Sequence, residues 1–133
     1  MRIPIIQAKG SFGFCSSVRQ AQMTVREAIV EFLGSPSTAS FGLLCEAGSR
    51  YVKFEREVLL SAAARLLDAD SLQQLHRNHD ELVRALDAVH SAVPGSQQLD
   101  EHTLRLRHAF LAQVGHCEAS VFPVLSVSTR RSP

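Results

Sequence analysis

Two stretches of the sequence place polar side chains four residues apart at the start of an apolar run. Tyr51 precedes Glu55 by one helical turn, and Gln113 precedes Cys117 by the same interval. Residues four apart lie on one face of an α-helix, so each pair shares a face with the apolar residues that follow it. We therefore expect both pairs to point into the protein core.

A histidine lies on a third stripe of this kind. Between Leu72 and Val93, apolar residues recur in alternating steps of three and four, and His79 is the only polar residue in the series. This period is typical of a helix that buries one face. If the helices are neighbours, Glu55 and His79 should meet inside the protein.

The chemistry of this cluster has two interpretations. A buried carboxylate must be paired, protonated or bound to a metal ion, because burying it alone is costly. Glu55, His79 and Cys117 could supply three ligands to a single iron or zinc ion, with Tyr51 as a fourth. Alternatively, Glu55 accepts hydrogen bonds from Tyr51 and His79, which would close an internal network without any metal.

The apolar periodicity predicts four helices and no strands. The helices are expected at about Ser17–Leu33, from Thr38 or Ser40 to Leu67, Ser71–Val93, and from Leu99 or Asp100 to Val121 or beyond. Short turns rich in glycine, proline, serine and aspartate separate them. The fold class is therefore all-α, an antiparallel up-down four-helix bundle, in which cofactor sites lie between facing helices.

The whole chain, residues 1–133, is expected to form a single domain. Residues 1–15 should form an extended N-terminal arm, because Pro4, Gly10 and Gly13 disfavour a regular helix. Pro123 should end or bend the last helix, and the polar tail at residues 126–133 should be mobile.

The amino-acid composition indicates which partners and which cellular compartment are expected. The 14 Lys and Arg residues nearly balance the 13 Asp and Glu residues, so no basic surface for nucleic acid is indicated. No segment approaches the ~20 apolar residues of a membrane span. The three cysteines are an odd number without Cys-x-x-Cys spacing, which favours free thiols and a cytoplasmic location.

The segments that carry these polar residues resemble the hemerythrin-like (HHE cation-binding) domains. The stretch from Tyr51 to Ala62 is similar to the second helix of that family, with Glu55 at its glutamate position and Tyr51 at its histidine position. His79 stands at a ligand position of the third helix. The ending Val121-Phe122-Pro123-Val124-Leu125 matches the fourth helix, whose metal positions hold Gln113 and Cys117.

This resemblance implies a hemerythrin-like bundle with a degenerate metal site. Family members use a non-haem di-iron centre to bind or sense oxygen and related small molecules. Here only Glu55 and His79 keep the family's ligands, and the first helix has no histidine. The resemblance thus implies either a single ion, held through Glu55, His79 and Cys117 or Tyr51, or no metal, with binding or sensing of a small ligand as the role.

Two other functions stay open. A metal-free bundle could act as a protein-interaction module, like the loosely similar bacterial proteins that hold a sigma factor. Cys15, Cys45 or Cys117 could instead serve a redox-responsive thiol protein. No nucleophile–base–orienter set or Gly-x-Ser-x-Gly motif can be read, which favours a binding protein over an enzyme.

Overall fold

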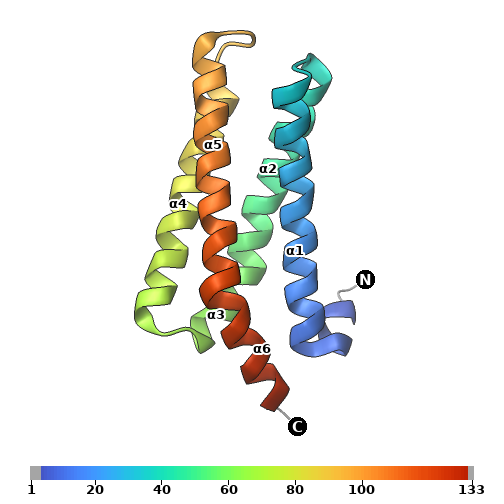
Figure 1. Ribbon diagram of the computed structural model, residues 1–133, viewed down its shortest axis with the longest axis vertical. Helices are drawn as coiled ribbons and strands as arrows, with labels where there is room; N and C mark the ends of the chain where they lie inside the picture. The colour runs from blue at the N-terminus through green and yellow to red at the C-terminus, as the bar shows by residue number, and fades with distance from the viewer. Residues whose placement is uncertain (1–3, 132–133) are drawn as a thin grey trace.

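The computed structural model describes the backbone of residues 4–131 and the side chains of residues 13–126. All regular secondary structure in this part of the chain is helical, and it forms four rods joined by short loops (Figure 1). The first rod is α1 and the third is α4, whereas the second and fourth are each interrupted by a five-residue π-helical turn. The elements are α1 (Pro4–Gly34), α2 (Thr38–Phe54), η1 (Glu55–Leu59), α3 (Leu60–Leu66), α4 (Ala69–Ser91), α5 (Gln97–His116), η2 (Cys117–Val121) and α6 (Phe122–Arg131).

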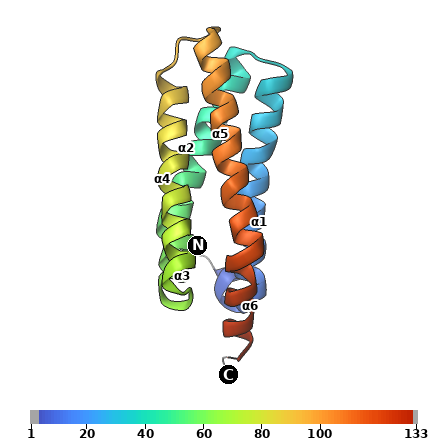
Figure 2. The ribbon, with the colours of Figure 1, turned by 60° about the vertical axis from the view of Figure 1, so that its left-hand side comes forward.

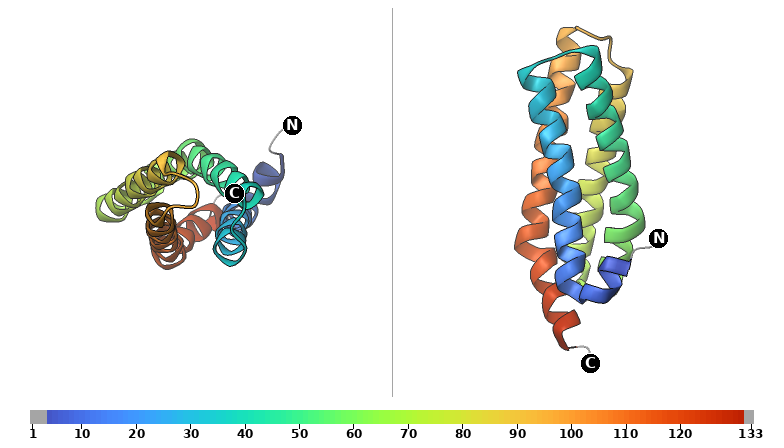
Figure 3. Two further views of the ribbon diagram at one scale, coloured as in Figure 1. Left: turned by 90° about the horizontal axis from the view of Figure 1, so that it is seen from above. Right: turned by 90° about the vertical axis from the view of Figure 1, so that its right-hand side faces the viewer.

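The rods run alternately up and down and lie side by side. Seen from above, α1, α2, α4 and α5 form the corners of the bundle (Figure 3). The loops after α1 and after α4 lie at the same end, and the loop between α3 and α4 lies at the other (Figure 2). The prediction of an all-α chain with four helical rods is confirmed.

Local side chains define where three of the rods begin. Ser37 caps α2 in a capping box with Ser40, Asp68 caps α4, and Ser96 caps α5. Each cap satisfies a backbone N–H group that has no partner inside the helix. Gly95 precedes the last cap with φ of 79°, a conformation that glycine adopts without strain.

The prediction of an extended arm at residues 1–15 is wrong for its described part. Helix α1 begins at Pro4 and runs without a break to Gly34; residues 1–3 lie outside the described chain. Proline is tolerated in the first turn of a helix because its missing N–H would have no helical partner there. A glycine costs a helix about 1 kcal/mol, and burial of residues such as Cys15 and Val18 supplies tertiary packing that offsets this cost.

Pro123 bends the last rod without ending it. Helix α6 starts at Phe122, directly after the π-helical turn, and continues to Arg131, leaving the line of α5 (Figure 1). The predicted mobile tail at 126–133 is therefore helical up to Arg131, and residues 132–133 lie outside the described chain. Proline lacks the N–H that an α-helical turn needs, and the wider turn before it relaxes that requirement.

The apolar core is divided into two clusters along the bundle. The upper cluster includes Ile29, Leu44 and Phe110, and the lower includes Val18, Leu59 and Val121. Four buried polar residues lie at the level between the clusters, and they are Gln22, Glu55, His79 and Gln113. The core is thus interrupted by a polar level at the position where a bundle can hold a binding site.

Candidate functional site

Glu55 and His79 meet inside the bundle. Glu55 is the first residue of η1 and is fully buried, and His79 on α4 is 6% exposed. The imidazole Nδ1 lies 2.6 Å from Glu55 Oε1, within hydrogen-bonding distance. The expectation that these two side chains come together from neighbouring helices is confirmed.

Tyr51 and Gln22 extend this contact into a chain of hydrogen bonds. The Tyr51 hydroxyl donates to Glu55 Oε2 over 2.8 Å, and Gln22 Nε2 donates to the same hydroxyl over 3.2 Å. Burial, with the nearby Glu55 carboxyl, raises the pKa of Tyr51 well above its usual value. Tyr51 therefore keeps its proton and acts as a donor to Glu55.

Gln113 and Cys117 complete the polar level from the fourth rod. Gln113 Nε2 donates to the Leu75 carbonyl over 3.2 Å, while Gln113 Oε1 is buried and has no partner among the described residues. Burial, and secondarily Glu55, raises the pKa of the Cys117 thiol to about 12 against an opposing hydrogen bond with Gln22. Cys117 is therefore a protonated, weakly reactive thiol at neutral pH.

We refer to these side chains together as the polar layer. All four rods contribute to it, since its members are Gln22 of α1, Tyr51 of α2, Glu55 of η1, His79 of α4, Gln113 of α5 and Cys117 of η2. Both oxygens of Glu55 have protein partners. The structure thus shows the contacts that the hydrogen-bond interpretation expects among Glu55, Tyr51 and His79.

Gln22 is the member that sequence reasoning missed. The buried series on α1 runs Val18, Gln22, Val25, Ile29 and Phe32, with alternating steps of four and three. Ala21, the residue next to Gln22, is an apolar residue that is only half-buried. A polar residue in strict register with buried neighbours was the available signal, and an adjacent alanine obscured it.

The polar layer has an internal two-fold pattern. The same number of residues separates Val18 from Leu75, Gln22 from His79 and Val25 from Leu82. A second constant interval relates the other two rods, because Tyr51 corresponds to Gln113, Glu55 to Cys117, Leu59 to Val121 and Leu60 to Phe122. Each half of the chain thus supplies three members of the layer from equivalent positions.

Both π-helical turns begin at a member of the layer. The N–H of Leu60 bonds to the Glu55 carbonyl, and the N–H of Phe122 bonds to the Cys117 carbonyl, each five residues apart. Such π-helical turns are rare in proteins overall, but those that do occur are often found at functional sites. The two turns lie at equivalent depths in two rods, which indicates that the polar layer is a specific feature of this fold.

The residues of the polar layer do not fit a di-iron centre. Such a centre needs several carboxylate and imidazole ligands, and the layer offers one carboxylate and one imidazole, already bonded to each other. Among the described residues, no group of three or more His, Cys, Asp or Glu side chains is placed to hold a metal ion. A single ion held through Glu55, His79 and Cys117 or Tyr51 therefore stays a prediction.

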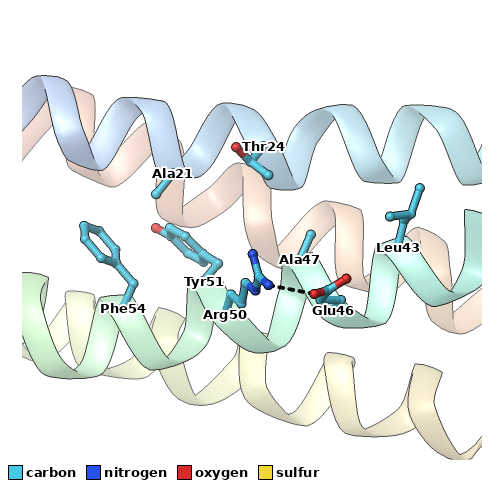
Figure 4. Close-up of a pocket in the computed structure, with 8 residues that line it drawn as sticks. All are labelled: Ala21, Thr24, Leu43, Glu46, Ala47, Arg50, Tyr51 and Phe54. Atoms are coloured by element: carbon cyan, nitrogen blue, oxygen red, sulfur yellow. Dashed lines mark ion pairs between the residues drawn. The ribbon is translucent and has the colours of Figure 1, made fainter.

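A second candidate feature is the outer face between α1 and α2. One cleft of about 360 Å³ is lined by Ala21, Thr24, Leu43, Ala47, Arg50 and Phe54 among others (Figure 4). A second cleft of about 430 Å³ adjoins it, lined by Glu27, Ala28, Glu31, Ala39 and Ser40 among others. Both clefts share Thr24, Leu43 and Ala47, so they form one continuous depression, which we call the α1–α2 groove.

Comparisons with protein-family models, with curated proteins and with solved structures gave no significant match. The hemerythrin-like resemblance thus has no support from these comparisons. Within residues 4–131, the helices lack a stretch whose length and apolar character would suffice to cross a membrane.

Proposed function

We propose that this protein is a metal-independent binding module, built on a four-helix bundle of hemerythrin-like layout, that acts by contacting another protein. The observation that carries the proposal is that both carboxylate oxygens of Glu55 already have hydrogen-bond partners within the protein. Its two oxygens accept from Tyr51 and face His79 Nδ1, at 2.8 Å and 2.6 Å. A carboxylate engaged in this way needs no metal ion to offset the cost of its burial.

The positions in the polar layer support the hemerythrin-like layout. Its members come from all four rods and lie at one depth, as the ligands of a metal centre in a bundle would. Gln22 occupies this depth on α1, the rod in which no histidine was found. In this proposal, hydrogen-bonding side chains have taken over the space that a di-iron centre fills in the family.

Surface features support a role in binding another protein. The α1–α2 groove is mainly apolar, and Leu43 within it is 55% exposed. Exposed apolar surface next to a groove is characteristic of interaction sites. Cys117 does not act as a competing nucleophile in this proposal, since it is a buried thiol whose pKa is raised to about 12.

A second candidate function is the binding of a small ligand or single metal ion at the polar layer. It is favoured by Gln113 Oε1, a buried oxygen without a partner among the described residues. His79 adds to it, because an imidazole whose Nδ1 faces a carboxylate is oriented like many metal-binding histidines. This candidate keeps the oxygen-related sensing role that the resemblance implies.

Metal analysis of untagged protein separates the two functions. We expect less than about 0.1 equivalent of iron or zinc after reconstitution and dialysis, and an unchanged melting temperature when a chelator is added. Stoichiometric metal that is lost in the His79→Ala variant would instead establish the second candidate. Glu81→Ala, a change on the exposed face of α4, is the matched control for that variant.

A further inference from the structure

We propose that the α1–α2 groove binds one amphipathic helix of a partner protein, and that this helix carries basic side chains toward α1. This inference rests on the proposed function as a protein-binding module and names its site and the chemistry of its partner. Grooves between two helices commonly receive a third helix through its apolar face.

The dimensions of the groove suit a helix. Its lining on α2 extends from Ala39 to Phe54, a length of about 22 Å at 1.5 Å per residue. Along α2 the first cleft is lined from Leu43 to Phe54 and the second from Ala39 to Ala47, so the two overlap and form one groove. Apolar anchors at positions i and i+7 of a partner helix, about 10 Å apart, would therefore both fit within the length of this groove.

The floor of the groove is small and apolar. Four alanines line it, Ala21 and Ala28 from α1 and Ala39 and Ala47 from α2, so large side chains of a partner can approach the backbone closely. Leu43 lines both clefts and is 55% exposed. Burial of apolar surface gives such an interface its main driving force.

The charge of the groove selects the partner. Three carboxylates line it, on Glu27, Glu31 and Glu46, against the single guanidinium of Arg50. Glu46 is paired with Arg50 over 2.8 Å. Among the described ion pairs, none includes Glu27 or Glu31, and both are exposed on α1. These two carboxylates are therefore available to Lys or Arg of a partner helix.

The same charges argue against other occupants. An acidic rim repels phosphate groups, which disfavours nucleic acid. A second copy of the chain would bring the two unpaired carboxylates of its own groove, and it would gain no matching basic rim. A basic amphipathic helix is the occupant that satisfies both the apolar floor and the acidic rim.

The test selects 16-residue peptides from a random library on the immobilised full-length protein. We expect the selected peptides to carry apolar residues at i, i+3 or i+4, and i+7, flanked by Lys or Arg. Their binding should weaken about tenfold when both Glu27→Lys and Glu31→Lys are introduced, because two charge contacts are lost and each new lysine repels the peptide. Fluorescence anisotropy of labelled peptide measures this change.

Two further variants sharpen the result. Ala47→Arg places a bulky side chain at the junction of the clefts and should also weaken binding about tenfold or more. Leu104→Arg, on α5, alters a 53% exposed residue that does not line the groove and should leave affinity within about twofold. Circular dichroism confirms that each variant is folded, and the exposed Glu27→Lys/Glu31→Lys pair remains informative if Ala47→Arg is not.

Three outcomes would overturn the inference. The first is the selection of peptides without basic residues, and the second is peptides that bind all variants equally. The third is a wild-type dimer in light scattering that Ala47→Arg dissociates, because this result would assign the groove to a second copy of the chain. If the protein is metal-free but the peptides fail in these ways, the groove inference fails alone. A stoichiometric metal requirement would instead reject the proposed function.

Discussion

Glu55 bears the only buried carboxylate among the described residues, and its surroundings explain how the fold tolerates it. Desolvation of a carboxylate is expensive, so partners must replace the lost water. Tyr51 and His79 provide contacts to both oxygens, and Gln22 in turn orients Tyr51. The three neighbours come from three different rods, so the carboxylate also fixes their relative positions.

Removing this carboxylate should destabilise the protein strongly. We expect Glu55→Ala to lower the free energy of unfolding by about 3 kcal/mol or more, because Tyr51 and His79 would be left buried without their partner. Glu55→Gln keeps one acceptor oxygen and should cost about 1 kcal/mol. Urea denaturation measures both changes, with Glu57→Ala as an exposed control on the same turn. Equal losses for Ala and Gln would contradict the hydrogen-bond account.

The Cys117 thiol predicts how stability depends on pH. Because burial raises its pKa to about 12, the folded protein keeps a proton that the unfolded chain releases above its usual thiol pKa of about 8.5. Stability should therefore fall as pH rises through this window, by about 1.4 kcal/mol per unit. Urea denaturation at pH 8.5 and pH 10 measures the slope.

Two cysteine variants test whether Cys117 causes this dependence of stability on pH. Cys117→Val removes the titrating group and should reduce the loss of stability between the two pH values. Cys45→Ser, which changes a half-buried thiol outside the polar layer, should leave most of the loss in place. A slope that Cys117→Val does not alter would assign it to other groups.

The sequence predicted part of the polar layer for a clear physical reason. Glu55 and His79 stand in register with long apolar series, so the helical period alone places them in the core. The period cannot show what a side chain meets across the bundle. For that reason, the hydrogen bonds of Gln113 to the Leu75 carbonyl and of Gln22 to Tyr51 were not predictable.

At the scale of elements, the π-helical turns mark the difference between prediction and structure. The second and fourth rods were each predicted as one regular helix, but each contains a π-helical turn that the apolar period does not reveal. The turn before Pro123 also explains why the last helix bends and continues. The helical N-terminus escaped prediction because glycine and proline penalties are local, whereas packing of α1 against its neighbours is not.

The π-helical turn η2 should reduce the free-energy cost of having a proline at position 123. A proline inside a regular α-helix costs about 3 kcal/mol, so its replacement there would be strongly stabilising. We expect Pro123→Ala to raise the free energy of unfolding by about 1 kcal/mol or less, because the π-helical turn already lacks the regular bond. Thermal or urea denaturation checks this value. A gain near the full proline penalty would show that the turn gives no relief.

Two glycines of α2 should respond differently to alanine. A methyl group at Gly42 would meet nothing within 4 Å, so Gly42→Ala should stabilise the helix by about 1 kcal/mol. At Gly48 the new carbon would lie 2.7 Å from Leu86 Cδ1 on α4. Gly48→Ala should therefore lose this gain or destabilise the protein, since α2 and α4 pack closely there. Urea denaturation of the matched pair decides, and equal gains would contradict the close contact.

At the scale of the whole molecule, the constant intervals between buried residues indicate two structurally equivalent helical hairpins. Gln22 and His79 are equivalent, as are Glu55 and Cys117. Each hairpin alone would expose the apolar face that the other covers. The bundle can therefore be regarded as a pseudo-dimer of hairpins joined by the short loop at Leu67 and Asp68.

Cutting this loop should yield halves that reassemble. Neither fragment 1–67 nor fragment 68–133 should be stably folded alone, because a single helical hairpin buries too little apolar surface. Mixed, they should form a 1:1 complex with the circular dichroism of the intact chain. Light scattering and titration calorimetry measure this association. Two monomeric, fully helical fragments that ignore each other would contradict the pseudo-dimer description.

The division of the core by the polar layer has a consequence for motion. Hydrophobic cooperativity is interrupted at the layer, so the two ends of the bundle can open separately rather than melt as one unit. Deuterium exchange should then reveal two populations of slowly exchanging amides, one around Leu44 and Leu86 and one around Leu59 and Val121. The end that includes most of the α1–α2 groove could therefore open locally when a partner helix binds, while the opposite end stays folded.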